Sequence, residues 1–240
     1  MIAIKSFYID DICIDVGVPT RVQEKEAMFA LRKKEYLKRG YTSRLYRDGS
    51  DIDEYDYTEG CEYFIAENEK EIIGTVRLIR DFYLPTETKC FTFEEPEVMN
   101  KIPRENRAEI SRLIVRSDHL FLPEHLVMLM LFSGMSGFGA VSEIEAGYAF
   151  IKTSLKRIFQ KIKFPIHVIE EYTNIYSDKL LQGYFESRID PPVPMYFLRE
   201  EIDDALKIIL AFKGIHNTDF PTRESVTIFP ALFSFLLTAG

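Results

Sequence analysis

The chain has 240 residues, of which 46% are hydrophobic and 28% are charged, and its formal net charge is -8. This composition is ordinary for a soluble globular protein, and the length suits one large domain. A negative net charge argues against a nucleic-acid-binding protein, whose contact face is usually basic. We therefore expect a single domain over 1–240, with a C-terminal extension over about 213–240, and no nucleic-acid partner.

The N-terminus and the cysteines indicate a cytoplasmic protein. The opening MIAIKSFYIDDI lacks the sustained apolar run and the small-residue cleavage site of a signal peptide. No stretch approaches the ~20 apolar residues that a membrane span needs. The three cysteines, Cys13, Cys61 and Cys90, show no paired spacing, which suits a reducing compartment. Neither they nor the four histidines have the spacing of a metal site, so we expect no metal.

The first predicted element is a helix over 21–39. Thr20 and Gln23 form a capping box at its start, and Gly40 marks its end. A polar, acidic loop follows over 47–60 and reads RDGSDIDEYDYTEG.

A hairpin and a charged strand come next. The strand-like runs 61–67 and 71–81 are joined by a short polar turn, which predicts a hairpin. The next strand, 107–115, reads RAEISRLIV and carries Glu109 and Arg112 among apolar residues. Burying an unpaired charge costs several kcal/mol or more, so both charges must be paired. In an ideal strand these two side chains point to opposite faces, so they can share a site only if a β-bulge lies between them.

The second half of the chain mixes helices and strands. An apolar helix over 124–132 is followed by a flexible Gly/Ser break over 132–142. Ser142 and Glu145 then form a capping box for a long amphipathic helix over 144–162. The remaining predicted elements are strands at 165–171 and 193–198 and a helix at 200–212. The sequence therefore predicts an α+β fold (an α/β mixed sheet), in which helices flank one central mixed β-sheet.

Four short motifs occur in a fixed order within the first half of the chain. They are Arg32 and Tyr36 on the first helix, Asp53 and Asp56 in the acidic loop, GTVRL at 74–78, and EISR at 109–112. This ordered set resembles the acyl-homoserine-lactone autoinducer synthases of quorum sensing and the related N-acyl amino acid synthases. Both families have the GNAT acyltransferase fold, and the resemblance covers residues from about 25 to 116.

The resemblance implies a charged cluster beside an acyl-transfer site. Three basic and three acidic side chains neutralise one another there, and together they can hold a zwitterion by its ammonium and carboxylate. Glu109 is the expected general base, because burial raises the pKa of a carboxyl group. The expected catalytic residues are Glu109, Ser111 and Arg112, with a backbone N–H of 110–114 as oxyanion donor, and the expected substrate-binding residues are Arg32, Tyr36, Asp53, Asp56, Arg77, Phe91 and Phe93. Core packing is the simpler interpretation of the two phenylalanines.

The predicted acyl donor follows from a loop and a basic segment. GNAT enzymes that use coenzyme A usually carry a Gly-rich loop after this strand, to hold the pyrophosphate. Here the continuation VRSDHLFLPEH has no glycine, so we expect the acyl-phosphopantetheine of an acyl carrier protein as donor and no tightly bound cofactor. Segment 151–163 is basic, and we expect Lys152, Lys156 and Arg157 to face that acidic carrier, although such a face can also be solvated charge.

The implied function is transfer of a fatty acyl group from a carrier-protein thioester to the amine of an amino acid or a related small acceptor. One alternative is an acyl-homoserine-lactone synthase that uses S-adenosylmethionine. Another is a non-catalytic acyl- or lipid-binding module on the same fold. The apolar tail at 226–237 has three open interpretations, namely core packing, a lid over an acyl tunnel, or peripheral contact with lipid.

Overall fold

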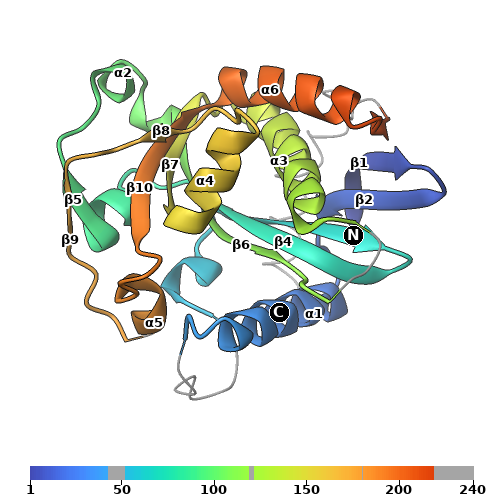
Figure 1. Cartoon of the computed structure of the whole chain (residues 1–240), viewed down its shortest axis with the longest axis horizontal. Coiled ribbons are helices and arrows are strands. Elements are labelled where there is room, and N and C mark those ends of the chain that lie inside the picture. The colour runs from blue at the N-terminus through green and yellow to red at the C-terminus, as the bar shows by residue number, and fades with distance from the viewer. Residues whose placement is uncertain (43–51, 119–121, 180, 219–240) are drawn as a thin grey trace.

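The computed structural model of the chain describes residues 1–42, 52–118, 122–179 and 181–218 (Figure 1). The apolar tail at 226–237 lies outside these residues, so its three interpretations stay open. Most of the expected C-terminal extension and residues 47–51 of the acidic loop also lie outside them.

Nine strands form one mixed sheet in the described part of the chain, in the order β11-β1-β2-β3-β4-β6-β7-β10-β8. All neighbouring pairs are antiparallel except β6 and β7, which run parallel. A second, small sheet pairs β5 with β9. The strands are β1 (Ile2–Ile9), β2 (Ile12–Val18), β3 (Cys61–Asn68), β4 (Glu71–Ile79), β5 (Phe91–Phe93), β6 (Arg107–Val115), β7 (Ala146–Lys152), β8 (His167–Val168), β9 (Tyr172–Asn174), β10 (Pro192–Leu198) and β11 (His216–Asn217).

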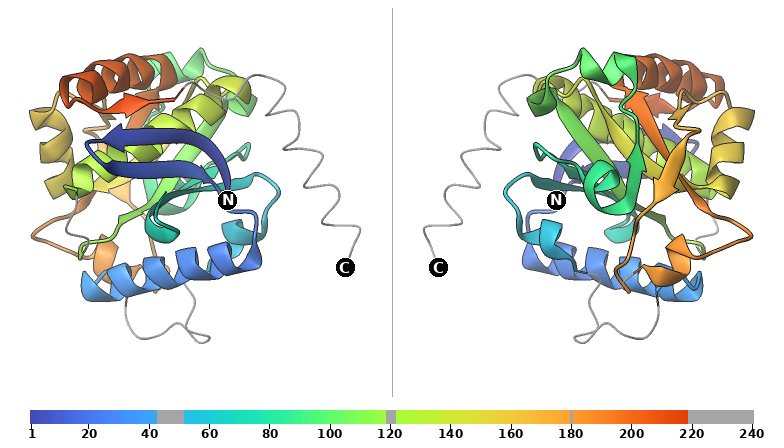
Figure 2. Two further views of the ribbon diagram at one scale, coloured as in Figure 1. Left: turned by 90° about the vertical axis from the view of Figure 1, so that its right-hand side faces the viewer. Right: turned by 90° about the vertical axis from the view of Figure 1, so that its left-hand side faces the viewer.

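Helices cover both faces of the main sheet, which confirms the predicted α+β fold class (Figures 1 and 2). One face carries α1, and the other carries α3 with α6 packed against it. The α-helices are α1 (Val22–Lys38), α2 (Glu97–Asn100), α3 (Glu124–Val141), α4 (Thr153–Lys161), α5 (Gln182–Phe185) and α6 (Arg199–Phe212), and the short 3-10 and π turns are η1 (Glu54–Tyr57), η2 (Thr86–Cys90) and η3 (Arg104–Asn106).

Helix α1 matches the predicted helix, but its cap lies one residue further along the chain. Arg21, not Thr20, is the N-cap residue, and Glu24, not Gln23, closes the capping box. The Glu24 carboxylate accepts hydrogen bonds from the backbone N–H groups of Thr20 and Arg21, at 2.9 and 3.0 Å. A carboxylate in the first turn also interacts favourably with the helix dipole, which favours Glu24 over the neutral Gln23.

The β3–β4 hairpin and strand β6 are confirmed, whereas the hairpin of β1 and β2 was not predicted. The two strands turn at Asp10, which adopts a positive φ of 50°. Their apolar residues alternate only in part, because Lys5 is buried as well, with its ammonium donating to Ser133 Oγ at 3.0 Å. Because a charged residue occupies a buried position, the sequence does not show the alternation of apolar and polar residues that identifies a strand.

The predicted Gly/Ser break at 132–142 is wrong, because α3 continues through it to Val141. The small residues allow close packing instead. A Cβ on Gly134 would lie 2.5 Å from Val16 Cγ1, and the hydroxyl of Ser136 donates to Asp203. By length and hydropathy α3 could cross a membrane, but 72% of it is buried within the molecule, as a core helix is.

The predicted helix over 144–162 is also wrong in its first half. Residues Ala146–Lys152 form strand β7, and the helix α4 begins only at Thr153. Strand β7 pairs with β6 on one edge and with β10 on the other, and most of its residues are buried. A strand buried on both faces has no alternation of apolar and polar residues, so sequence periodicity does not distinguish it from a buried helix. The strand expected at 165–171 is reduced to β8, while β10 and α6 agree with the prediction.

Strands β6 and β7 separate near their midpoints, and this separation positions the candidate site. They pair from Arg107–Ala146 to Ile110–Ala149, and beyond these residues the pairing ends. Both strands nevertheless continue, to Val115 and Lys152. The continuing halves lie on opposite sides of a cavity.

Candidate active site

A β-bulge in β6 brings Glu109 and Arg112 to one cavity. Between the pairs Thr75–Ile114 and Arg77–Ser111, one residue of β4 faces two residues of β6, which is the signature of a bulge. Arg112 adopts a positive φ of 52°, a rare conformation for a residue with a side chain. Both Glu109 and Arg112 line the cavity, so the bulge expected from the sequence is confirmed.

Two aspartates join three arginines in a buried network. Arg77 Nη1 lies 2.7 Å from Asp53 Oδ1 and 2.6 Å from Asp56 Oδ1. Arg112 Nη2 lies 2.7 Å from Asp53 Oδ2, and Arg32 Nη1 lies 3.6 Å from Asp56 Oδ1. Burial alone would raise the pKa of Asp53, but the Arg112 and Arg77 guanidiniums hold that pKa well below its ordinary value. The expected cluster therefore assembles from α1, η1, β4 and β6.

Turn η1 fixes the two aspartates relative to each other. Asp53 is its N-cap residue and accepts a hydrogen bond from the Tyr55 N–H at 3.1 Å. The Asp56 carboxylate in turn accepts one from the Asp53 N–H at 2.7 Å, and the Tyr63 hydroxyl donates to Asp56 as well. The D-x-x-D spacing places both aspartates in one capping box, and this box turns both carboxylates toward Arg77.

Glu109 is almost fully buried, with 1% of its surface exposed. Its Oε2 accepts a hydrogen bond from the Thr86 N–H, at the start of η2, at 2.6 Å. Burial raises the pKa of Glu109 to about 7, although the Thr86 hydrogen bonds and the Arg77 charge oppose the shift. A carboxyl group with this pKa can accept a proton near neutral pH, as a general base must.

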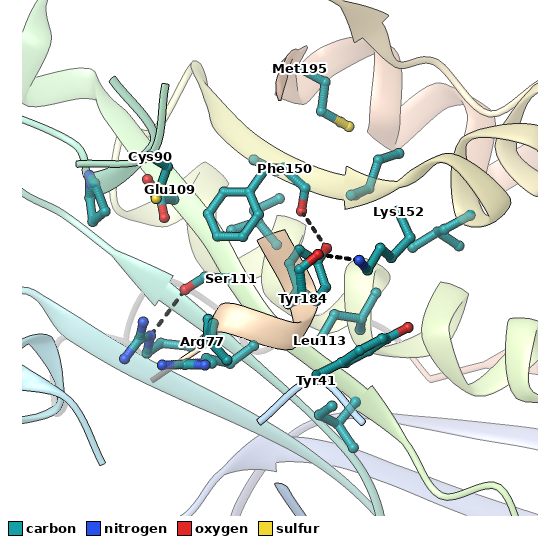
Figure 3. Close-up of a pocket in the computed structure, with 18 of the residues that line it drawn as sticks. Tyr41, Arg77, Cys90, Glu109, Ser111, Leu113, Phe150, Lys152, Tyr184 and Met195 are labelled. Atoms are coloured by element: carbon teal, nitrogen blue, oxygen red, sulfur yellow. Dashed lines mark hydrogen bonds between the residues drawn. The ribbon is translucent and has the colours of Figure 1, made fainter. Parts of the chain in front are cut away.

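The cavity has a volume of about 590 Å³ and lies between the separated halves of β6 and β7 (Figure 3). Its polar part includes Glu109, Ser111 and Arg112, and Cys90 lies beside Glu109. Its apolar part is formed by side chains from α3, α4, β10 and the segment after α4, namely Met128, Phe132, Phe159, Phe164, Met195 and Phe197. The cavity therefore suits a ligand with a polar reacting group and a hydrocarbon chain.

The structure brings Tyr36, Ser111 and Arg77 to the same cavity as Glu109 and Arg112. The Arg112 guanidinium lies 5.5 Å from the centre of the Tyr36 ring, and the Arg77 Nε donates to Ser111 Oγ at 3.0 Å. All three residues line the cavity. Arg32 is fully buried and does not line the cavity, and it pairs with Asp56, which Arg77 also contacts.

Phe91 is a core residue, Phe93 is partly buried and packs against the core, and neither lines the cavity. Phe91 is fully buried and packs against Phe150, Tyr172 and Phe185, with ring centres 5.4–5.9 Å apart. Core packing, the simpler of the two interpretations, therefore holds for Phe91. Phe93 packs against Tyr148 with ring centres 5.4 Å apart.

The three residues expected to face a carrier protein occupy different environments. Arg157 is exposed, and Lys156 is half-buried with its Nζ 3.6 Å from Glu170. Lys152 is only 4% exposed and lines the cavity, so its assignment to an exposed docking face is wrong. The reason is the strand β7, which ends at Lys152 and carries this side chain inward.

Sequence reasoning missed the aromatic side of the cavity. Tyr41, Phe150 and Tyr184 line it (Figure 3), as does Tyr176, and the four residues come from separate segments. Tyr184 N–H donates to the Tyr41 carbonyl at 3.2 Å, which joins α5 to the end of α1. No local spacing relates these residues, so only the fold reveals them. Among the described residues, no group of three or more His, Cys, Asp or Glu side chains is arranged to hold a metal ion.

The fold and the site define an acyltransferase of the GNAT type, and comparisons with known proteins agree. Residues 27–171, more than half of the chain, match the family of the N-acyl amino acid synthase FeeM. The chain therefore belongs to this family and is an N-acyltransferase. No curated protein matches the sequence.

Solved structures share the fold at low sequence identity. The AHL synthase LasI has a TM-score of 0.59 and 15% identity, and the match covers 81% of this chain and 94% of that one. The coenzyme A-dependent acyl-homoserine lactone synthase MesI has a TM-score of 0.55 and 15% identity, over 79% and 88%. FeeM, an N-acyl amino acid synthase from uncultured soil microbes, has a TM-score of 0.52 and 11% identity, over 84% and 97%. At this identity the likeness shows the fold alone.

Proposed function

We propose that the protein transfers a fatty acyl group from the thioester of an acyl carrier protein to the amine of an amino acid. The observation that carries this proposal is the cavity between β6 and β7, which joins a buried carboxyl group of raised pKa to an apolar chamber. The membership in the FeeM family supports the acceptor class. The absence of a glycine between Val115 and Glu124 supports a donor without a pyrophosphate, and the three free cysteines suit the cytoplasm.

The charges of the site suit an amino acid as acceptor. Arg32, Arg77 and Arg112 face Asp53 and Asp56, and with Glu109 ionised these six charges sum to zero, which suits a zwitterion. The acceptor carboxylate would lie toward the arginines that line the cavity. The acceptor ammonium would lie toward Glu109, which takes its proton and leaves the neutral amine that can attack.

The transfer itself requires alignment more than activation, because a thioester is already reactive. The amine nitrogen attacks the thioester carbon, and a backbone N–H of β6 stabilises the oxyanion that forms. The carbon–sulfur bond then breaks, and the pantetheine leaves as its thiol, taking up the proton that the nitrogen loses as the amide forms. The apolar chamber lined by Met128, Phe132 and Met195 would hold the acyl chain during these steps.

The purified protein should form N-acyl amino acids from acyl carrier protein and a mixture of amino acids, as mass spectrometry would show. A parallel reaction with S-adenosylmethionine tests the alternative acceptor. A lactone product from that reaction, with no N-acyl amino acid from the first, would overturn the proposed acceptor. Release of free fatty acid alone would overturn acyl transfer to an amine. A side-by-side reaction with acyl-coenzyme A tests the donor, and we expect it to be used poorly.

A further inference from the structure

Lys152 is a buried cation in the wall of the cavity. It is the last residue of β7, and 4% of its surface is exposed. Its ammonium donates a hydrogen bond to the Tyr184 carbonyl and lies 4.1 Å from the centre of the Tyr184 ring and 5.2 Å from that of Tyr41 (Figure 3).

Within the part of the chain that the structure describes, no ion pair neutralises the charge of Lys152, because no carboxylate there lies within ion-pair distance of its ammonium. Asp190 is near enough to interact with the charge, but its two oxygens accept hydrogen bonds from the N–H and the hydroxyl of Ser154, each at 2.7 Å. Burial dominates and lowers the pKa of Lys152 to about 8.

An unpaired buried cation destabilises a fold, so a functional reason for it is expected. A methionine would fill the same space without that cost. An ammonium has three N–H groups, of which the Tyr184 carbonyl takes one. The other two are available to an acceptor atom that enters the cavity, and the aromatic rings hold the ammonium in place meanwhile.

The position of Lys152 along β7 indicates which part of a ligand it meets. The reacting groups lie where β6 and β7 separate, beside Ile110 and Ala149. Lys152 lies three residues further along β7, or about 10 Å in an extended strand. An extended pantetheine arm carries both of its amide carbonyls within about 10 Å of its sulfur, whereas its phosphate lies beyond that distance.

We propose that the Lys152 ammonium binds an amide carbonyl of the pantetheine arm of the acyl donor. This inference rests on the proposed function, since it assumes a pantetheine thioester as donor. It makes Lys152 a positioning residue for the donor, in contact with the arm and not with the surface of the carrier protein. The thioester would be held at the point where β6 and β7 separate, next to Glu109.

Binding of an unreactive probe tests the inference without any chemical step. S-octyl pantetheine, a thioether, carries both amides but has no acyl group to transfer. We expect Lys152→Met to weaken its binding by about 10-fold or more, as calorimetry would measure, because a hydrogen bond to a charged group is lost. The same substitution on exposed α6, Lys207→Met, should leave binding unchanged. S-octyl thioglycerol has the same alkyl chain and no amide, and its binding should be unchanged in both variants.

Kinetics and stability complete the test. With acyl-pantetheine and with acyl carrier protein, Lys152→Met should raise KM by similar factors and leave kcat within about threefold. Its melting temperature should be unchanged or higher, because the variant removes an unpaired buried charge. Lys152→Gln provides a second, neutral variant in case the methionine disturbs the fold, and it should show the same loss.

The outcomes separate this inference from the proposed function. Equal binding of S-octyl pantetheine by the wild type, Lys152→Met and Lys152→Gln would overturn the role of Lys152, even if acyl transfer occurs. Equal weakening of both probes would also overturn it, because that result indicates a general change of the cavity. Loss confined to the amide-containing probe supports the inference, even if no acyl transfer to an amine is found.

Discussion

At the scale of single residues, Glu109 controls the charge of the site. While it is protonated, the three arginines exceed the two aspartates by one charge, and when it ionises the sum is zero. Its pKa of about 7 places this change near neutral pH. Binding of an acceptor carboxylate and removal of the acceptor's proton are therefore linked through one side chain.

Glu109→Gln should keep the fold and lower the rate of acyl transfer by roughly 10²–10⁴, the usual contribution of general acid–base catalysis. In the wild type, kcat/KM should rise with pH through about 7 and then level off, because the base acts only when ionised. The rise should vanish in the variant. Near wild-type rates in Glu109→Gln would remove this residue from the mechanism, and Glu105→Gln, at an exposed position of η3, is the matched control.

The same group should make stability depend on pH. Its folded pKa is raised from 4.5 to about 7, so its contribution is most favourable below pH 4.5 and is lost as pH rises through 7. A glutamine does not ionise, so Glu109→Gln does not lose this stability as the pH rises. The variant should therefore gain stability relative to the wild type between pH 4.5 and 8, by about 3 kcal/mol. Thermal melting of both proteins at pH 5 and pH 8 measures the difference, and a constant difference would contradict the raised pKa.

At the scale of elements, the sequence predicted those parts whose patterns are local. The β3–β4 hairpin follows from two apolar runs around a turn, and the bulge in β6 follows from the requirement that two buried charges share a site. Strand β7 was not predicted, because its extended conformation depends on pairing with β6 and β10, which are distant in sequence. For the same reason, the charged half of the site was predicted and the aromatic half was missed.

Gly147 decides how closely β6 and β7 approach before they separate. A Cβ at this position would lie 1.7 Å from the Ala108 carbonyl oxygen, which is backbone and cannot move aside as a side chain can. Gly147→Ala should therefore destabilise the protein by about 1–3 kcal/mol or more and lower its melting temperature.

Gly139→Ala is the control for this prediction. It lies inside α3, where a Cβ would lie 3.3 Å from Arg199 Cδ, part of a flexible side chain. Alanine favours a helix over glycine by about 0.5–1 kcal/mol, so this variant should be neutral or more stable. Equal melting temperatures for the two alanine variants would show that the β6–β7 contact does not limit stability.

At the scale of the whole molecule, the positive surface of α4 stands out against a net charge of -8. Arg157 is exposed and Lys156 half-buried on this helix, and the Lys156–Glu170 pair at the surface contributes little to stability. Such a surface would attract an acidic carrier protein mainly by faster association.

Lys156→Glu with Arg157→Glu should raise KM for acyl carrier protein about 3–10-fold and leave kcat nearly unchanged. Acyl-pantetheine has no acidic surface, so its KM should not change. Added salt should reduce the effect, because it screens charges beyond ~8–10 Å. If the double variant affects neither donor, the carrier docks elsewhere on the molecule.

The separation of β6 from β7 also bears on how the backbone exchanges its amide hydrogens with solvent. The Arg116 N–H donates to the Ile73 carbonyl at 2.9 Å, toward β4, so alternation along the strand points the Val115 N–H the other way, into the cavity. None of the described strands pairs with Val115 on that side, so its N–H should exchange fast although its side chain is buried, while the N–H groups of Arg116 and Ile114 exchange slowly. An extended donor between the two strands would supply the missing acceptor. Protection of the Val115 N–H from exchange that appears only when S-octyl pantetheine is added would show that this probe lies against β6 and accepts a hydrogen bond from it, as a neighbouring strand does.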